Sequence, residues 1–264
     1  MKNFLSFLII ISLISYPFQV QAVTAQYCYD GTNTWASWWM EDLTDNTSNG
    51  YTLTNNSSAT FVAANFDNGG RVTSGSWFDY SASALGWAGG NISISVWIKM
   101  VTDSGTQELF QISDSVTTKT ALTMRYDGSS WILYRYRINE AVISVTETVA
   151  LGTTNWHHFV VTYNTAGSGT LTVYRNNVSK GTASGAGVGS GTPTASHFAL
   201  GKGTAPEICP ANYASAIYDE VIVENTVWDA TKVDAVYDRT DAAIKTSCAA
   251  VTAVPIISPL INFE

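Results

Sequence analysis

The sequence is short of basic residues: 13 Lys and Arg stand against 21 Asp and Glu, and the formal net charge is -8. No run of Lys or Arg interrupts this excess of acid. An acidic surface repels the phosphates of nucleic acids and the headgroups of anionic lipids. We therefore expect no nucleic-acid partner, and cations or neutral polymers are the partners that this charge favours.

Long apolar runs are missing after the N-terminus. Residues 1–22 combine the basic Lys2, an apolar stretch over 4–14 and the small residue Ala22, which is the pattern of a secretory signal peptide. The apolar stretch is shorter than the roughly 20 residues that cross a bilayer. We expect cleavage near Ala22 and a secreted or cell-surface protein that does not insert into the membrane.

Cysteine is scarce, with only Cys28, Cys209 and Cys248. In an oxidising compartment two of the three are expected to pair, and the sequence alone allows three pairings. A catalytic cysteine is the alternative, but a thiolate nucleophile needs a base and an electropositive setting. We find neither in the sequence.

The residues that are abundant belong to an extracellular β protein. The chain is 45% hydrophobic, 12% aromatic and only 13% charged, and Thr, Ser, Gly and Asn are frequent. Its length suits a single β-sandwich domain. We divide the chain into a signal peptide at 1–22, a leader at 23–35, one domain at 36–240 and a tail at 241–264.

The most informative stretch is residues 155–176. Two alternating runs of β-branched and aromatic residues, at 156–163 and 171–176, flank a loop rich in Gly, Ser and Asn. This pattern predicts an antiparallel hairpin. His157 and His158 are adjacent in the first run, so their side chains point to opposite faces and cannot bind one metal ion together.

Three further motifs support a β-rich chain. Residues 92–99 alternate strictly, so Ile92, Ile94, Val96 and Ile98 are expected to face the core and the opposite face to be at least partly wet. The Asp-Gly step at 127–128 predicts a tight hairpin turn. Asp229 is expected to cap a short helix that runs through Asp238.

These motifs resemble LamG-like jellyroll domains of the concanavalin A-like lectin/glucanase superfamily. The hairpin is similar to the family pattern Trp-x-His-Val-x-Val-Thr-Tyr, residues 217–224 to its closing strand Asp-Glu-Val-x-(Ile/Val), and Phe66 with 67–72 to its Phe-Asp-Gly element. The resemblance covers residues 36–238. It implies an all-β fold of two antiparallel sheets packed face to face in a jellyroll sandwich, with one short C-terminal helix. Because the termini of jellyrolls usually meet, it also favours a disulfide between Cys28 and Cys248.

The superfamily includes laminarinase-type glycoside hydrolases, in which two carboxylates lie about 5 Å apart, as in a Glu-x-Asp-x-x-Glu strand. Here Glu220 and Glu224 share a face of the one acidic strand, but they lie four residues, or roughly 13 Å, apart. The glucanase motif is absent. We expect a non-catalytic carbohydrate-binding or adhesion module. A glycoside hydrolase or polysaccharide lyase with an unusual acid pair and a structural envelope protein that binds another protein are the alternatives.

Sugar binding uses exposed aromatic rings beside polar side chains that bond hydroxyl groups. The candidates are Trp77, Tyr80 and Trp87 in loops and Tyr134, Arg135 and Tyr136 on a strand. Each ring can instead belong to the core. The expected ligand is a polysaccharide or the glycan of a glycoprotein.

Calcium is the one cofactor that the resemblance suggests, because several relatives bind it at a sheet rim with Asp, Asn and backbone carbonyls. Asp67 and Asn68 are the candidate ligands. Calcium needs about 6 to 8 oxygen ligands, and the sequence has no EF-hand spacing. Ordinary turn chemistry explains both residues equally well.

Overall fold

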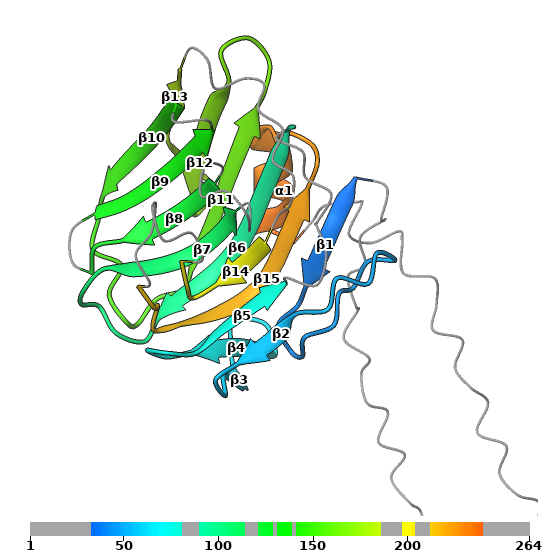
Figure 1. Ribbon diagram of the computed structural model, residues 1–264, viewed down its shortest axis with the longest axis vertical. Helices are drawn as coiled ribbons and strands as arrows, with labels where there is room; N and C mark the ends of the chain where they lie inside the picture. The colour runs from blue at the N-terminus through cyan, green and yellow to red at the C-terminus, as the bar shows by residue number, and fades with distance from the viewer. Residues whose placement is uncertain are drawn as a thin grey trace, which may run out of the picture.

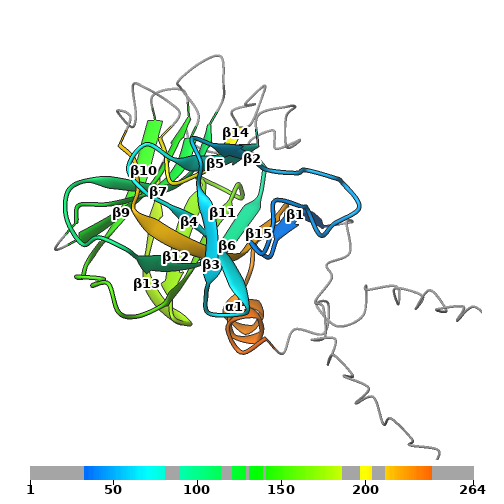
Figure 2. The same cartoon turned by 90° about the horizontal axis from the view of Figure 1, so that it is seen from below.

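The structure is a computed structural model that describes residues 33–80, 90–113, 121–128, 131–138, 141–185, 197–203 and 212–239. Two antiparallel sheets stack against each other, and one helix lies on the outside of one sheet (Figures 1 and 2). The expected two-sheet β-sandwich with one short helix is confirmed. No helix in the described ranges is long and apolar enough to cross a membrane. The three cysteines and Trp87 lie outside these ranges.

Sheet A has eight strands and is built around β6 and β15. Its order is β13 (Val178–Ser184), β12 (Thr170–Arg175), β11 (His157–Asn164), β6 (Ile92–Met100), β15 (Ala216–Glu224), β4 (Asn68–Val72) and β3 (Thr60–Ala63). β1 (Thr34–Trp38) also pairs with β15. The predicted hairpin is β11 and β12, with Val161 opposite Val173.

Sheet B has seven strands. Its order is β10 (Ala141–Thr148), β9 (Trp131–Ile138), β8 (Ala121–Tyr126), β7 (Gln107–Ser113), β14 (His197–Leu200), β5 (Trp77–Tyr80) and β2 (Thr54–Asn56). β8 and β9 form the hairpin that the Asp-Gly step predicts. Neighbours such as β7 and β14 are far apart in the sequence, so this sheet closes through long-range pairing.

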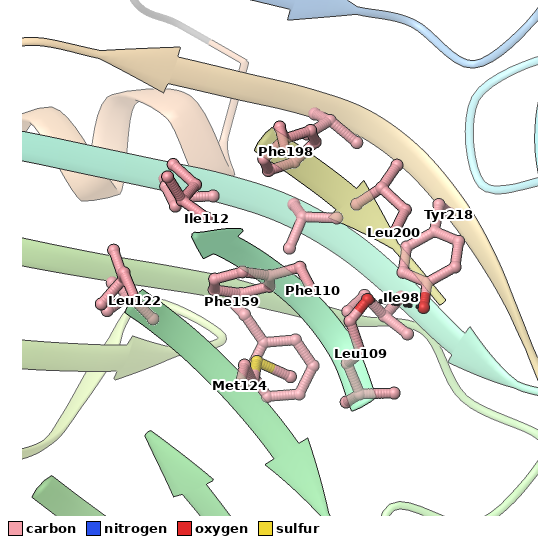
Figure 3. Close-up of a cluster of buried hydrophobic side chains, with 14 of the residues drawn as sticks. Ile98, Leu109, Phe110, Ile112, Leu122, Met124, Phe159, Phe198, Leu200 and Tyr218 are labelled. Atoms are coloured by element: carbon pink, nitrogen blue, oxygen red, sulfur yellow. Dashed lines mark hydrogen bonds between the residues drawn. The ribbon is translucent and has the colours of Figure 1, made fainter. Parts of the chain in front are cut away.

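The core lies between the sheets and is filled by apolar side chains from strands of both sheets. Phe110 and Phe198 of sheet B meet Ile98 and Phe159 of sheet A in this layer (Figure 3). The Tyr218 hydroxyl crosses the gap and donates a hydrogen bond of 2.7 Å to the carbonyl of Leu109. Because a buried hydroxyl is costly without a partner, this bond fixes how the two sheets lie over each other.

The outer face of β6 is covered at Ser93, Ser95 and Trp97, so the expectation of an at least partly wet face holds on this strand for Lys99 alone, which is partly exposed. Ser93 and Ser95 have no exposed surface, and Trp97 is only 8% exposed. The cover is α1 (Ala230–Tyr237) and the turn before it. Its apolar side chains form a second small core with those of β11 and β15; the members are Val160, Ile222, Trp228, Val233 and Val236.

The sequence features that produce this cover are as expected. Asp229 caps α1, and its carboxylate accepts a hydrogen bond of 2.8 Å from the backbone N–H of Lys232. Trp228 donates its backbone N–H to the hydroxyl of Ser93, which donates in turn to the carbonyl of Thr226. Ser93 of β6 is therefore an anchor for the turn before the helix rather than a solvated residue.

A β-bulge in β15 changes which of its acidic side chains lie on the outer face of sheet A. Asp219 pairs with Trp97 and Ile222 with Ser95, so β15 has one residue more than β6 over this interval. Glu220 takes the extra position with a φ of 44°. Asp219 therefore lies on the outer face together with Ile222 and Glu224, whereas a regular strand would have placed it on the core face.

A tight contact at Gly69 provides a test of the packing between β4 and β15. A Cβ atom at Gly69 would lie 2.7 Å from the backbone oxygen of Tyr218 and 2.6 Å from the Cβ of Ala64. We expect Gly69→Ala to lower the free energy of unfolding by about 1–3 kcal/mol, since a backbone oxygen cannot move aside alone. Urea unfolding followed by circular dichroism measures this change.

Gly90→Ala is the matched control, because its added Cβ would have no atom within 4 Å. Equal unfolding free energies for the two variants would contradict the packing that we describe.

Candidate functional site

The outer face of sheet B is polar. Backbone pairing joins one position from each strand into a row that crosses the whole sheet: Thr54, Asp79, Ala199, Gln111, Thr123, Arg135 and Ser144. Gln111 and Thr123, in the middle, are buried, whereas Thr54 at one end and Ser144 at the other are exposed. The accessible polar groups therefore lie toward the two edges of the sheet.

Strand β5 supplies aromatic and acidic side chains at one of these edges. Phe78 and Tyr80 face the core, so Trp77 and Asp79 face outward. A tight turn before β5 helps to set which of its side chains face outward. In this turn the Ser76 hydroxyl accepts a hydrogen bond of 2.9 Å from the backbone N–H of Thr73. Both outward side chains are partly exposed.

Five partly exposed side chains meet here, and we call them the Trp77 cluster: Asn56, Trp77, Asp79, Lys202 and Tyr213. The rings of Trp77 and Tyr213 have centroids 5.8 Å apart at an angle of 42°. The Lys202 ammonium lies 3.7 Å from the centroid of Trp77 and 5.5 Å from that of Tyr213. Asp79 accepts hydrogen bonds from the Asn56 amide at 2.9 Å and from the Trp77 indole at 3.3 Å.

Sequence reasoning missed Lys202 and Tyr213. Each follows or precedes a strand, and an isolated antiparallel bridge between them brings them together. They also lie more than 100 positions after Trp77 in the sequence. No local pattern marks this pairing; only the position of β14 beside β5 could have indicated it.

The structure separates the predicted sugar-binding residues. The prediction that Tyr80 and Tyr134 present exposed rings is wrong: Tyr80 is 7% exposed and Tyr134 is fully buried, because both lie on the core faces of their strands. Trp77 lies on β5 rather than in a loop. Arg135 occupies a position in the polar row and Tyr136 pairs with the core residue Leu122, both on β9.

Asp67 and Asn68 are exposed at the start of β4. Asp67 has a φ of 57°, which fits its place in the turn. Burial, followed by the charge of Asp67, raises the pKa of Glu41 beside it. Among the described residues no group of three His, Cys, Asp or Glu is arranged to hold a metal ion. Calcium binding at this turn stays a prediction.

A second polar group lies on the outer face of sheet A, at the C-terminal end of α1. Asp219 is fully buried and accepts a hydrogen bond of 2.8 Å from the backbone N–H of Phe66. Glu220 is paired with Arg239, whose guanidinium lies 3.9 Å from the centroid of the Phe66 ring. These contacts join the end of the helix to the bulge of β15.

The acids of β15 are engaged in structural contacts. The Glu224 carboxylate accepts hydrogen bonds from the Thr34 hydroxyl at 3.1 Å and the Thr226 hydroxyl at 3.0 Å, and also from the Trp228 indole at 2.5 Å. Glu220 is held by Arg239. Because Asp219 has no exposed surface, a substrate cannot reach it. This arrangement gives no support to a hydrolytic acid pair on this strand.

The two histidines lie on opposite faces of β11, as strand geometry predicts. His157 contacts the carbonyl of Leu151 at 3.1 Å. His158 packs against the rings of Trp97 and Tyr237 and contacts the Ser95 hydroxyl at 2.7 Å. Burial lowers the pKa of His158 to about 3. His158 is therefore a neutral packing residue under the helix.

Comparison with known proteins agrees with this geometry. The model of the concanavalin A-like lectin/glucanases superfamily matches residues 73–234. No curated protein sequence matches the chain.

Among solved structures, domain 4 of AbnA, an extracellular arabinanase from Geobacillus stearothermophilus, was determined in complex with arabinotriose. It is 16% identical with a TM-score of 0.58, and the match covers 79% of this chain and 98% of that domain. A structure of botulinum neurotoxin type C, whose cell entry depends on two ganglioside molecules, is 13% identical with a TM-score of 0.57 and coverages of 79% and 51%.

The binding domain of botulinum neurotoxin DC in complex with SialylT is 11% identical with a TM-score of 0.59, and the match covers 80% of this chain and 52% of that one. The chain thus spans about half the length of the toxin chains. At these identities the likeness shows the shared fold.

The buried Asp219 predicts a pH dependence of stability. Burial raises the pKa of the Asp219 carboxyl, and the hydrogen bond from the backbone N–H of Phe66 lowers it by less. The result is a pKa raised from 3.8 to about 8. The folded state then holds a proton that the unfolded state loses, so this group's stabilisation is complete below pH 4 and disappears as the pH rises toward 8. We expect Asp219→Asn to reduce the fall in unfolding free energy between pH 5 and 9, with each pKa unit worth about 1.4 kcal/mol.

The measurement is urea unfolding at pH 5, 7 and 9. Burial also raises the pKa of Glu220, to about 7, so a smaller slope of the same sign remains in the variant. His158 acts in the opposite direction, losing stability as the pH falls from 6.5 toward 3. Asp42→Asn, which removes an exposed carboxylate, is the control. Parallel pH profiles for Asp219→Asn and the native chain would show that Asp219 is ionised throughout.

Proposed function

This chain belongs to the concanavalin A-like lectin/glucanases superfamily, and from that premise we propose that it is a secreted, non-catalytic carbohydrate-binding module whose sugar site is the Trp77 cluster. The ligand is a polysaccharide or the glycan of a glycoprotein. The observation that carries the proposal is the meeting of two partly exposed rings, Trp77 and Tyr213, with the amide and carboxylate groups of Asn56 and Asp79.

The chemistry of the cluster suits a sugar. Aromatic rings offer flat apolar surface to the C–H groups of a pyranose, while neighbouring polar side chains bond its hydroxyl groups. Asp79 accepts hydrogen bonds at the edge of the Trp77 ring, so a hydroxyl that reaches this edge meets an acceptor already fixed in place. Fixed groups lose less conformational entropy when a ligand binds.

The AbnA domain supports a binding role more directly than the toxins do. Its match extends over 98% of that domain, which carries arabinotriose in its structure. The toxin matches extend over about half of each chain, so glycan binding by the toxins bears on the matched half less directly. The neurotoxin DC structure is that of a binding domain and the AbnA domain holds a sugar, which favours binding over catalysis here.

Replacing the two rings tests the site. We expect Trp77→Ala and Tyr213→Ala each to weaken binding to the best ligand of a polysaccharide panel by about 2 kcal/mol, or roughly 30-fold, because each removes a stacking surface. Affinity electrophoresis in gels that contain each polysaccharide selects the ligand, and titration calorimetry gives the dissociation constants. All measurements are run with calcium and with EGTA.

Phe61→Ala is the matched control, because Phe61 is a 37% exposed ring on β3 of sheet A. Binding that falls equally in all three variants would move the site away from the Trp77 cluster. If none of the polysaccharides slows the migration of the protein, the result counts against carbohydrate binding altogether.

We also propose that residues 1–22 are removed during export. N-terminal sequencing of protein collected outside the cytoplasm is expected to begin at Val23, because Ala22 supplies the small residue that signal peptidase requires. A protein that keeps Met1 and stays in the cytoplasmic fraction would contradict secretion.

A further inference from the structure

Lys202 differs from four other basic residues of the described chain, which contact an acid, because its ammonium contacts aromatic rings alone within the described ranges. Lys180 pairs with Glu147 and Lys232 with Glu224, and the arginines at 175 and 239 also pair with Glu. In the described part of the chain Lys202 makes no ion pair. Its ammonium is held instead over Trp77 and within reach of Tyr213.

Asp79, the acid of the Trp77 cluster, occupies a different place. Its carboxylate lies at the edge of the Trp77 ring, where it accepts hydrogen bonds from the indole and from Asn56. Lys202 lies over the face of the same ring. The cluster therefore has an acceptor at the ring edge and, at the ring face, a positive charge that forms no ion pair with any residue that the structure describes.

From this arrangement, and resting on the proposed sugar site, we propose that the Trp77 cluster selects acidic sugars, with the carboxylate of a uronic or sialic acid pairing with Lys202. The sugar ring stacks beside the ammonium on the aromatic pair, and its hydroxyl groups bond Asp79 and Asn56. Lys202 is a specificity-determining residue, since an acidic sugar gives its ammonium a counterion that no residue of the described ranges supplies.

The net charge of -8 opposes this choice only weakly. At physiological salt the Debye length is about 8 Å, so carboxylates elsewhere on the surface are largely screened. The rings displace water from one side of the ammonium, and an ion pair in such a partly desolvated place is stronger than one in open water. The nearest charges therefore decide the preference.

Pairs of oligosaccharides with and without an acidic group test the proposal; tetragalacturonate and its methyl ester differ in charge alone and are the decisive pair, whereas the acidic member of each other pair carries an additional sugar. The probes are tetragalacturonate and its methyl ester, sialyllactose and lactose, and xylan oligomers with and without glucuronate. Calorimetric titration of the full mature chain is run at low and at high salt. We expect at least one acidic probe to bind about 10-fold more tightly than its neutral partner, a difference of about 1.4 kcal/mol, and to lose this advantage at high salt.

Three variants test whether Lys202 causes the preference for the acidic probe. Lys202→Met keeps the length of the side chain and is expected to bind both members of the pair with the affinity of the neutral one. Lys202→Arg is expected to retain the preference. Lys99→Met removes an equal charge from β6 of sheet A and is expected to change nothing. Unfolding midpoints confirm that each variant is folded.

Equal binding of acidic and neutral probes that is still lost in Trp77→Ala would overturn the acidic preference and leave the sugar site in place. The same holds if Lys202→Met keeps the full preference. Absence of binding to every probe and to every polysaccharide of the panel overturns both proposals.

Discussion

The sandwich depends on β15, because both edges of this strand are hydrogen-bonded. One edge is bound to β6 on both sides of the bulge. The other edge binds β4 at residues 216–218 and β1 at residues 221–224. The change of partner falls at Asp219 and Glu220, where the extra residue of the bulge turns the strand. The bulge thus lies where the pairing of the C-terminal strand β15 changes between two N-terminal strands, β4 and β1.

The two outer faces have different roles as a result. α1 covers the outer face of sheet A with an apolar contact, and the end of the helix is joined to the bulge through Arg239 and Glu220. Sheet B keeps a polar outer face with partly exposed rings at its β5 edge. α1 packs on sheet A, whereas β5, which carries Trp77 and Asp79, belongs to the other sheet (Figure 2).

Strand periodicity determines which parts of the fold and of the candidate site can be predicted from the sequence. The hairpin of β11 and β12, the core face of β6 and the cap at Asp229 follow from local pattern alone. In β5 and β9 the sequence does not indicate which side chains point to the core, because both faces of each strand carry aromatic or other large side chains. Trp77 was therefore chosen correctly as a partly exposed ring, and Tyr80 and Tyr134 were not. The bulge in β15 and the bridge that joins Lys202 to Tyr213 are tertiary features without a local signature.

The position of β15 also bears on how the protein is made. The strand lies between β6 and β1, yet Thr34 and its partner Glu224 are 190 residues apart. Sheet A cannot close until the last strand has left the ribosome, and such long-range pairing is intrinsically slow. The growing chain consequently has no complete core to bury during synthesis. Sheet A therefore becomes complete only after β15 has been synthesised, whereas the hairpin of β11 and β12 can form earlier.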